Sequence, residues 1–387
     1  MVQHTRHINR AAVLTELFRA HPTTRGQIVD ATGISAATVS RTIEQLLDEG
    51  LVFEVPGAPA EGRGRPSILI DVVAQRSYVL GIDLGASTTR FVVVSLVAQP
   101  VARSQVRTPQ LLDGGALALW LNDQARIAAG DFWPDTRQIA LGLPGAVSGT
   151  DRSVSNAPNL PQVEDKEFLA TFESAVGRQV LLDNDANFAL LGEQKFGAAR
   201  DSPTAAMLTI GAGLGVGLAL EGHIIRGPRG MVGEFGHLPV GPLGTRLEQM
   251  LTGPRLLLRA QDLGIELESP ADLFNDSDNS QIRALRAQFD QALLIALTAV
   301  IVSCEPSIVV LGGGIAKSLG PHLPRYEEAI VQNLQFHTRL TITSLGDFAG
   351  ALGAAVAALQ KVYQELGVMP DGLPSLPPAQ EITADLR

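Results

Sequence analysis

The segment 233–250, GEFGHLPVGPLGTRLEQM, places one histidine between two carboxylates in a stretch rich in glycine and proline. Three kinds of site use such a set: a metal site, an acid–base pair, and a clamp for the hydroxyl groups of a polyol. A carboxylate accepts hydrogen bonds from hydroxyls, and a neutral imidazole donates one and accepts one. Glu234, His237 and Glu248 are therefore candidate ligands of a polar molecule.

A second polar group stands where a strand pattern gives way to a helix pattern, in the segment 181–193, LLDNDANFALLGE. One interpretation is that Asn184 and Asp185 only cap the free backbone amides at the start of the helix. The other is that both side chains point into a cleft and bind hydroxyls. Asp185 could then also accept a proton from one of them.

Glycines follow β-rich runs at three places in the chain. The first run ends in Asp83 and turns through Gly85, the second turns through Gly211 and Gly213, and the third ends at Gly313. Such turns expose backbone amides that can hold an anion. An aspartate at a strand end beside a small-residue turn is where phosphate and magnesium sit in actin-like ATPases. The alternative for the first run is a plain β-hairpin with an exposed aspartate.

The elements that must position these residues alternate between strand and helix patterns from residue 78 onward. Three strand–glycine units with intervening helices predict an α/β fold in which two lobes face a cleft. We place the first lobe at 73–190, completed by a C-terminal helix at about 346–366, and the second lobe at 191–345. The Pro-rich tail, 367–387, is expected to be loosely ordered or to lie along the surface.

Residues 1–72 show helical patterns followed by two short β-rich runs. Gly33 can turn the chain, and Ser35 can cap the next helix. A helix, a helix-turn-helix and a two-stranded ribbon together make a winged helix-turn-helix, which reads the major groove of DNA with one helix. The outward face of that helix carries short or hydrogen-bonding side chains and one arginine: Ala37, Thr38, Arg41 and Gln45.

The segment between the two ribbon strands, GRGRP at 62–66, indicates a wing that contacts DNA. Glycines let a backbone approach a narrow minor groove, and arginines are attracted by its negative potential. Arg63 and Arg65 are therefore candidate DNA contacts. The alternative is a flexible hydrophilic linker.

The composition limits the class of protein. The 387 residues carry a net charge of −10, which argues against a protein that coats nucleic acid without specificity. Residues 1–67 hold seven arginines and seven acidic residues, so a neutral head permits DNA contact at one end only. The N-terminus lacks a signal-peptide pattern, and the longest apolar run, 292–304, is shorter than the roughly 20 residues of a membrane span. We therefore expect a cytoplasmic protein, a core helix at this run, and no membrane partner.

Nine segments of the chain, in order, resemble the ROK family of repressors and kinases: GIDLG, GLPG, APNLP, DNDAN, GAGLGVG, GEFGH, RLE, VVLGGGI and GALGAA. The resemblance covers residues 78–359, and residues 10–67 resemble the head of the family's regulators. It implies a two-lobed actin-like, ribonuclease H-like fold, with Asp185 at the position of the kinases' catalytic base. It also implies sugar-binding roles for Gly145, Asn159, Asn184, Asp185, Glu234, His237 and Glu248.

The chain departs from the family after GEFGH. Family members commonly carry a cysteine-rich loop there, which binds zinc together with the histidine. Here the loop has no cysteine, and a structural zinc ion needs about four ligands. We therefore expect no metal, and interpret His237 as a direct sugar ligand oriented by a neighbour. The alternative is a histidine with a purely structural role.

The phosphate loops depart as well. ROK kinases typically have a second glycine followed by threonine in the first loop, where this chain has Ala86 and Ser87, and Gly-Thr-Gly in the second, where it has Ala212 in the middle. A missing hydroxyl is a missing phosphate contact, and the methyl group of Ala86 obstructs close approach. We therefore expect no ATP requirement and no catalytic residue, and interpret five residues as vestigial nucleotide-binding positions: Asp83, Gly85, Gly211, Gly213 and Gly313.

These features together predict a sugar-responsive transcriptional regulator, a repressor of genes for carbohydrate uptake or catabolism. Its expected partners are duplex operator DNA, a sugar effector and further copies of itself in a homodimer or homotetramer. Sugar is expected to close the lobes and shift the two heads of a dimer. The alternative is a ROK-type ATP-dependent sugar kinase that retains a DNA-binding head. A scaffolding protein is disfavoured by the convergent polar residues.

Overall fold

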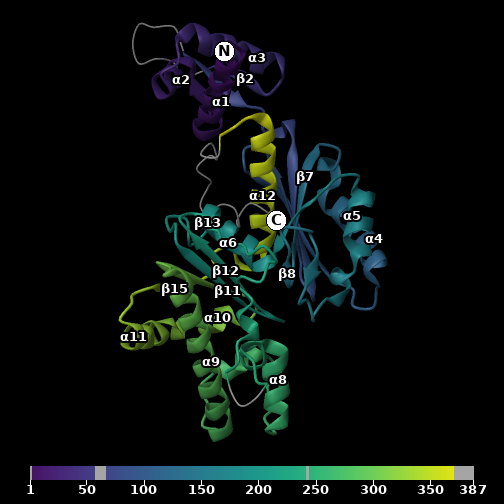
Figure 1. Ribbon diagram of the computed structural model, residues 1–387, viewed down its shortest axis with the longest axis vertical. Helices are drawn as coiled ribbons and strands as arrows, with labels where there is room; N and C mark the ends of the chain where they lie inside the picture. Colours follow the sequence, from purple (N-terminus) through teal and green to yellow (C-terminus); the bar gives the residue numbers. More distant parts are fainter. Residues whose placement is uncertain (1, 57–66, 241–243, 370–387) are drawn as a thin grey trace.

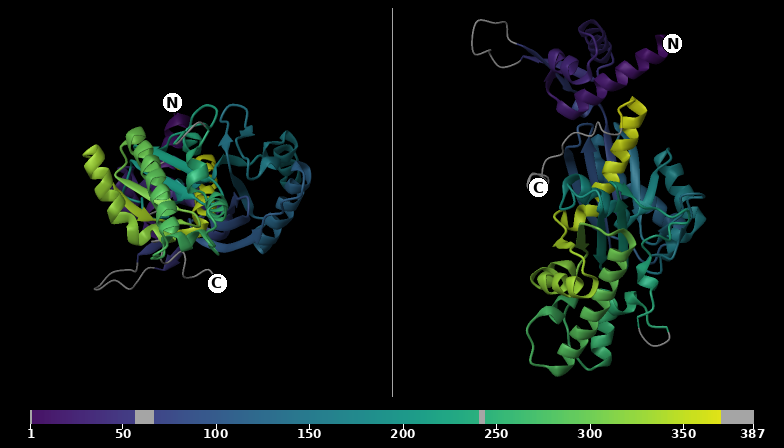
Figure 2. Two further views of the ribbon diagram at one scale, coloured as in Figure 1. Left: turned by 90° about the horizontal axis from the view of Figure 1, so that it is seen from below. Right: turned by 60° about the vertical axis from the view of Figure 1, so that its left-hand side comes forward.

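The computed structural model describes residues 2–56, 67–240 and 244–369 (Figure 1). The chain forms an N-terminal head and two lobes, each built on a five-stranded sheet. Figures 1 and 2 show the head at one end of the long axis, with the lobes beyond it. Arg63 and Arg65 of the predicted wing and the predicted tail from residue 370 onward lie outside the described residues.

The head consists of three helices and a small antiparallel sheet with strand order β1-β3-β2. A capping box of Thr24 and Gln27 begins α2, and Gly33, with a φ of 68°, caps its C-terminal end. Ser35 caps α3 by accepting a hydrogen bond from the Thr38 amide, so the predicted turn and cap are both present. The elements are α1 Val2–Ala20, β1 Thr23–Thr24, α2 Arg25–Thr32, α3 Ala36–Asp48, β2 Val52–Pro56 and β3 Ile68–Val72.

The first lobe is built around the sheet β10-β7-β4-β5-β6. β4, β5 and β6 form an antiparallel meander, and β7 and β10 run parallel to β4. Alternate residues of β4 face opposite layers: Leu80 and Ile82 pack with α4 and α5, and Val79 packs with α12. The elements are β4 Tyr78–Leu84, β5 Thr88–Ser95, β6 Pro100–Arg107, α4 Gly114–Ala129, β7 Thr136–Leu143, β8 Ala146–Val147, β9 Val154–Ser155, α5 Lys166–Val176, β10 Leu181–Asn184 and α12 Ala349–Leu366.

The second lobe is built around the sheet β13-β12-β11-β14-β15, in which β11, β14 and β15 are parallel. Met207 and Val310 face α6, and Leu208 and Leu311 face α9 and its neighbours. The elements are α6 Asp185–Phe196, β11 Ala205–Ile210, β12 Leu214–Leu220, β13 His223–Ile224, α7 Leu247–Leu251, α8 Gly253–Asp262, α9 Ser280–Cys304, β14 Ile308–Gly312, α10 Ala316–Leu319, α11 Leu323–Leu334 and β15 Arg339–Ile342.

α9 is the one helix of the described chain that is long and apolar enough to cross a membrane by length and composition alone. Its side chains Phe289, Leu293, Leu297 and Ile301 are buried in the core of the second lobe. The apolar run therefore forms the core helix that the sequence predicts.

α6 and α12 pack directly against each other between the two sheets (Figure 1). Small residues make this approach close: a Cβ on Gly353 would lie 1.6 Å from the carbonyl oxygen of Phe188, and one on Gly192 would lie 2.7 Å from that of Ala349. On its other side, α12 presses so closely on β4 that a Cβ on Gly81 would lie 2.0 Å from the Ala351 oxygen. The α6–α12 pair therefore fixes the spacing of the two sheets.

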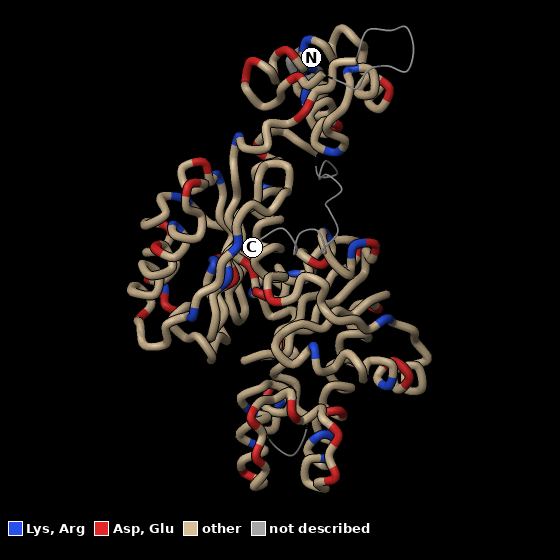
Figure 3. Tube along the Cα trace, turned by 180° about the vertical axis from the view of Figure 1, so that it is seen from behind, with Lys and Arg blue, Asp and Glu red and all other residues tan. Residues whose placement is uncertain are grey.

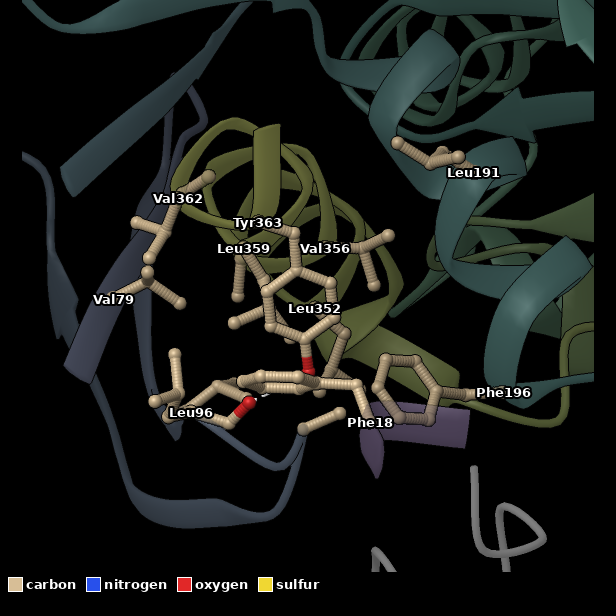
Figure 4. Close-up of a cluster of buried hydrophobic side chains, with 14 of the residues drawn as sticks. Phe18, Val79, Leu96, Leu191, Phe196, Leu352, Val356, Leu359, Val362 and Tyr363 are labelled. Atoms are coloured by element: carbon tan, nitrogen blue, oxygen red, sulfur yellow. Dashed lines mark hydrogen bonds between the residues drawn. The ribbon is translucent and has the colours of Figure 1, made fainter. Parts of the chain in front are cut away.

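The head and the body share one buried apolar cluster. Figure 4 shows Phe18 of α1 beside Tyr363 of α12 and Phe196 at the end of α6. The rings of Phe18 and Tyr363 meet edge to face with centroids 4.6 Å apart. The Tyr363 hydroxyl donates a hydrogen bond of 2.6 Å to the carbonyl of Leu96, and the Met369 amide donates one of 2.9 Å to the Thr15 hydroxyl. The head is thus anchored to the ends of both central helices.

Candidate functional site

A cavity of about 750 Å³ lies between the two lobes. Loops of the first lobe and loops of the second lobe both contribute to the lining, as does the start of α12. The cavity brings together all twelve residues of the body that the sequence predicts to bind sugar or to have bound nucleotide: Asp83, Gly85, Gly145, Asn159, Asn184, Asp185, Gly211, Gly213, Glu234, His237, Glu248 and Gly313.

Asn184 occupies the junction between β10 and α6 and is held there by three hydrogen bonds. Its side-chain oxygen accepts from the amides of Ala186 and Asn187, and its amide group donates to the carbonyl of Gly145 at 3.0 Å. Gly145 has a φ of +85°, and a Cβ there would lie 2.5 Å from the Ser155 oxygen, so this position requires glycine. The capping interpretation of Asn184 therefore holds in the structure, and its side chain also lines the cavity.

Asp185 is the first residue of α6 and faces the cavity. One carboxylate oxygen accepts a hydrogen bond of 2.7 Å from the Ala186 amide. Burial raises the pKa of Asp185 to about 6, because the hydrogen bonds that favour the charged form only partly offset the loss of solvent. A carboxyl group with such a pKa can accept a proton near neutral pH.

Glu234 and Glu248 reach the same part of the cavity from the second lobe. Burial, followed by the charges of Asp185 and Glu248, raises the pKa of Glu234 to about 7. Glu248 and Asn159 flank Gly213: a Cβ there would lie 3.3 Å from the Asn159 amide nitrogen and 3.6 Å from a Glu248 oxygen. Three carboxyl groups and an amide thus converge where the loops of both lobes meet, which suits a ligand with several hydroxyls.

His237 ends the short 3₁₀ helix η4, Phe235–His237, and lines the cavity. Its Nδ1 lies 2.9 Å from Nη1 of Arg246, and its Nε2 lies 3.8 Å from a carboxylate oxygen of Glu234. Arg246 is therefore the orienting neighbour that the sequence leaves unidentified. The ring has a structural partner and also a face toward the cavity.

Two observations bear on the zinc site that the family resemblance implies at His237. Among the described residues, no group of three or more histidine, cysteine, aspartate or glutamate side chains has a geometry that could hold a metal ion. Cys304 is buried in the core of the second lobe, and the Nδ1 atom of His237 already faces a guanidinium group.

The other end of the cavity is formed by backbone turns around Asp83. Burial, together with the charge of Asp185, raises the pKa of Asp83 to about 7, although Arg90 opposes this shift. Gly350 at the start of α12 presses on this carboxyl, since a Cβ there would lie 2.9 Å from it. Gly313 has a φ of +87°, and its Cβ would lie 2.4 Å from the Ile210 oxygen. The fold itself therefore requires glycine at 313.

Two polar contacts join the lobes directly. Arg226 of the second lobe forms an ion pair of 2.6 Å with Asp183 at the end of β10. The Asn159 amide donates a hydrogen bond of 3.3 Å to the carbonyl of Ala212 in the opposite glycine loop. Both contacts join residues of the first lobe to residues of the second.

Sequence reasoning misses several residues at the cavity. Arg90 lies opposite Asp83 in the β4–β5 register, and Asp347 stands just before α12; both line the cavity and lie 3.8 Å apart at their charged atoms. The strand register of the first hairpin could identify Arg90. Arg246 stands two residues before Glu248, but its contact with His237 depends on how the intervening loop folds back.

The outward face of α3 in the head matches the prediction in part. Ala37, Arg41 and Gln45 are exposed, whereas Thr38 is half-buried and its hydroxyl lies 3.0 Å from that of Ser35. Thr38 therefore already takes part in the N-terminal cap of the helix. Arg63 and Arg65, the remaining candidate DNA contacts, lie outside the described residues.

Comparison with known proteins agrees with this architecture. The ROK family model matches residues 79–361. The xylose repressor of Bacillus subtilis is 23% identical over 363 residues, with coverage of 89% of this chain and 93% of the repressor. The glucokinase of Thermotoga maritima is 27% identical over 312 residues, with coverage of 73% and 98%. A crystal structure of a ROK family transcriptional regulator, a homologue of the E. coli MLC protein, has a TM-score of 0.73 at 21% identity, with coverage of 96% and 98%.

Proposed function

The chain belongs to the ROK family, and on that premise we propose that it is a sugar-responsive transcriptional repressor that binds duplex DNA through its head. One observation carries the proposal: the seven candidate sugar-binding positions, spread from Gly145 to Glu248, line one cavity, and two helices lead from that cavity to the head. The similarity to the Bacillus subtilis xylose repressor over nearly the full length of both chains supports it.

The sugar-binding part of the proposal rests on complementary hydrogen bonding. A sugar hydroxyl both donates and accepts, and Asp185, Glu234 and Glu248 supply acceptors around the cavity. Asn159 and His237 add donors. The sugar is proposed to contact both lobes, because Asn159 belongs to the first lobe and Glu234 to the second.

The DNA-binding part of the proposal rests on the head. Three helices followed by a β2–β3 ribbon have the order of a winged helix-turn-helix, and α3 leaves Arg41 and Gln45 free to reach base edges. Figure 3 shows basic and acidic residues interleaved on the head, which favours specific contacts over a uniform attraction to phosphate. In this proposal Arg63 and Arg65 contact the minor groove.

The link between sugar and DNA is proposed to run through α6 and α12. α6 begins at Asp185 in the cavity and ends at Phe196, and α12 begins beside Asp83 and ends beyond Tyr363. Both ends meet Phe18 of the head (Figure 4). A sugar that changes the angle between the lobes would therefore move the surface on which the head packs. In a homodimer or homotetramer, that movement would alter the spacing of two heads on an operator.

We further propose that the cavity is non-catalytic and needs neither ATP nor zinc. Ala86, Ser87 and Ala212 stand where ROK kinases typically have groups that approach phosphates, and Arg246 stands against His237. The alternative function, an ATP-dependent sugar kinase with a DNA-binding head, is favoured by one observation. Asp185 faces the cavity with a pKa near neutrality, as a catalytic base would.

The test combines three measurements on the full chain. A thermal-shift screen with xylose, glucose and N-acetylglucosamine is expected to reveal a stabilising sugar. Selection from a random duplex pool should enrich one sequence, and the sugar should change the affinity for that sequence. Arg41→Ala should weaken duplex binding about 10-fold or more and leave sugar binding unchanged. Failure to enrich any duplex would contradict the regulator, and steady release of ADP with sugar and ATP would favour the kinase.

A further inference from the structure

We infer that Arg246 is a positioning residue: it holds His237 in the tautomer that carries its proton on Nε2, so that the ring donates a hydrogen bond into the cavity. The inference rests on the proposed function for the identity of the ligand, a sugar. The state of the ring itself follows from the contacts of the ligand-free protein.

The direction of the Arg246–His237 hydrogen bond determines where the proton sits. Nη1 of Arg246 lies 2.9 Å from Nδ1 of His237. A guanidinium group only donates hydrogen bonds, so Nδ1 must be the acceptor. A neutral imidazole has one protonated nitrogen, which is therefore Nε2. An imidazolium ring would offer Arg246 no acceptor.

The proton on Nε2 remains available to a ligand. Nε2 lies 3.8 Å from a carboxylate oxygen of Glu234, beyond the 2.7–3.2 Å range typical of such hydrogen bonds. Both side chains line the cavity. A hydroxyl placed beside them can accept from Nε2–H and donate to Glu234, which are the two bonds that one sugar hydroxyl makes. His237 then supplies the donor and Glu234 the acceptor for one hydroxyl. His237 is a donor at Nε2 only in the tautomer that carries its proton there.

The backbone holds Arg246 in place independently of its side chain. Pro239 and Arg246 form an antiparallel bridge, flanked by hydrogen bonds of 3.0 Å from Val240 to Thr245 and from Leu247 to Leu238. The Arg246 amide also donates to the side chain of Gln249 at 2.8 Å. The Arg246 side chain is exposed, so its replacement should leave the loop and the start of α7 intact.

The first test reads the tautomer directly in protein labelled with ¹⁵N-histidine, without sugar, at a pH where the ring is neutral. The His237 signals are identified by their loss in His237→Gln. We expect a protonated Nε2 and a bare Nδ1 in the wild type, and a mixture with protonated Nδ1 in Arg246→Met. Arg246→Lys, which keeps a donor, should restore the wild-type pattern, and Arg283→Met, at an exposed arginine of α9, is the surface control. A protonated Nδ1 in the wild type, or no change in Arg246→Met, would overturn the inference.

The second test asks whether Arg246 acts on the ligand through His237. Calorimetry uses whichever of xylose, glucose and N-acetylglucosamine most raises the wild-type melting temperature. Arg246→Met should weaken binding about 5- to 10-fold, and Arg246→Lys should recover most of the loss. In a His237→Leu background, Arg246→Met should have no further effect. An equal loss in both backgrounds would show that Arg246 acts on the loop and would overturn the inference. If the wild type binds none of these sugars, the proposed function fails, while the tautomer measurement still decides the state of the ring.

Discussion

The two ends of the cavity differ in the atoms that they offer a ligand. At one end, Asp185, Glu234 and His237 present side chains that are free to bond a hydroxyl. At the other end, the turns at Gly211 and Gly313 present backbone, and Asp83 lines the cavity as a half-buried carboxyl group with a raised pKa. Gly313 could not be replaced without a clash with β11, whatever the cavity binds. A glycine that the fold itself requires is therefore weak evidence for nucleotide binding, and the side chains are the better guide to function.

The largest expected effect comes from a change that forces α6 and α12 apart, because both ends of the cavity depend on the packing of these two helices. Gly353→Ala places a methyl group against the Phe188 carbonyl, where no space exists. We expect a loss of more than about 4 kcal/mol in the free energy of unfolding, or failure to fold. Chemical denaturation measures this loss. Gly149→Ala is the control, because no atom lies within 4 Å of its Cβ position; equal stability of both variants would contradict the packing argument.

The next pair of changes tests whether the sugar contacts only one end of the cavity. At pH 8, where Glu234 is largely ionised, Glu234→Gln should weaken sugar binding about 10- to 100-fold, because a charge-assisted hydrogen bond is lost while the shape is kept. Asp83→Asn at the other end should change it less than about 3-fold. Titration calorimetry with the stabilising sugar measures both affinities. A similar loss in the two variants would show that the sugar occupies the whole cavity.

A smaller effect should appear in the pH dependence of stability. The pKa of Glu234 is raised from 4.5 to about 7, so the folded protein holds a proton that the unfolded chain releases. The resulting stabilisation is complete below about pH 4.5 and is lost as the pH rises through 7. Glu234→Gln removes this contribution, which is at most about 3 kcal/mol and is reduced because part of the side chain meets solvent. The free energy of unfolding should therefore fall less steeply between pH 5 and 8 in the variant than in the wild type. Parallel curves of this free energy against pH would contradict the raised pKa.

The smallest expected effect concerns the phosphate end. Ala212→Thr adds the hydroxyl that ROK kinases typically have in the second glycine loop, and should raise ATP affinity by a few-fold at most. Ala212→Val adds the same bulk without the hydroxyl and should not. Both variants should bind the sugar as the wild type does. ATP binding measured by fluorescence competition compares them, and an equal gain in both would assign the effect to bulk.

Much of this arrangement is readable from local patterns in the sequence. Gly33 and Ser35 mark the turn between α2 and α3, and Asn184 marks the start of α6, because caps depend on a few neighbouring residues. The convergence of Glu234 and Asp185 on one cavity could be predicted from the matched family motifs, but not from local patterns.

Contacts that depend on register or on close approach are not readable in this way. The bond between Arg246 and His237 requires the loop after His237 to fold back with one particular pairing, which no local pattern specifies. Gly353 and Gly192 look like ordinary small helix residues, and only the α6–α12 contact shows why no side chain fits. The buried carboxylate of Glu193 accepts from the Ala198 and Leu345 amides, which are far apart in sequence.

The buried cluster around Phe18 has a consequence for how the molecule melts and how it can be rebuilt. Detaching the head would leave the rings of Tyr363 and Phe196 exposed to water, so calorimetry should record head and body in a single cooperative transition. A chimera that joins this head to another sensor domain would need aromatic side chains equivalent to Tyr363 and Phe196 to pack against Phe18. Exchange of one part at a time, without its counterpart, should yield proteins that precipitate.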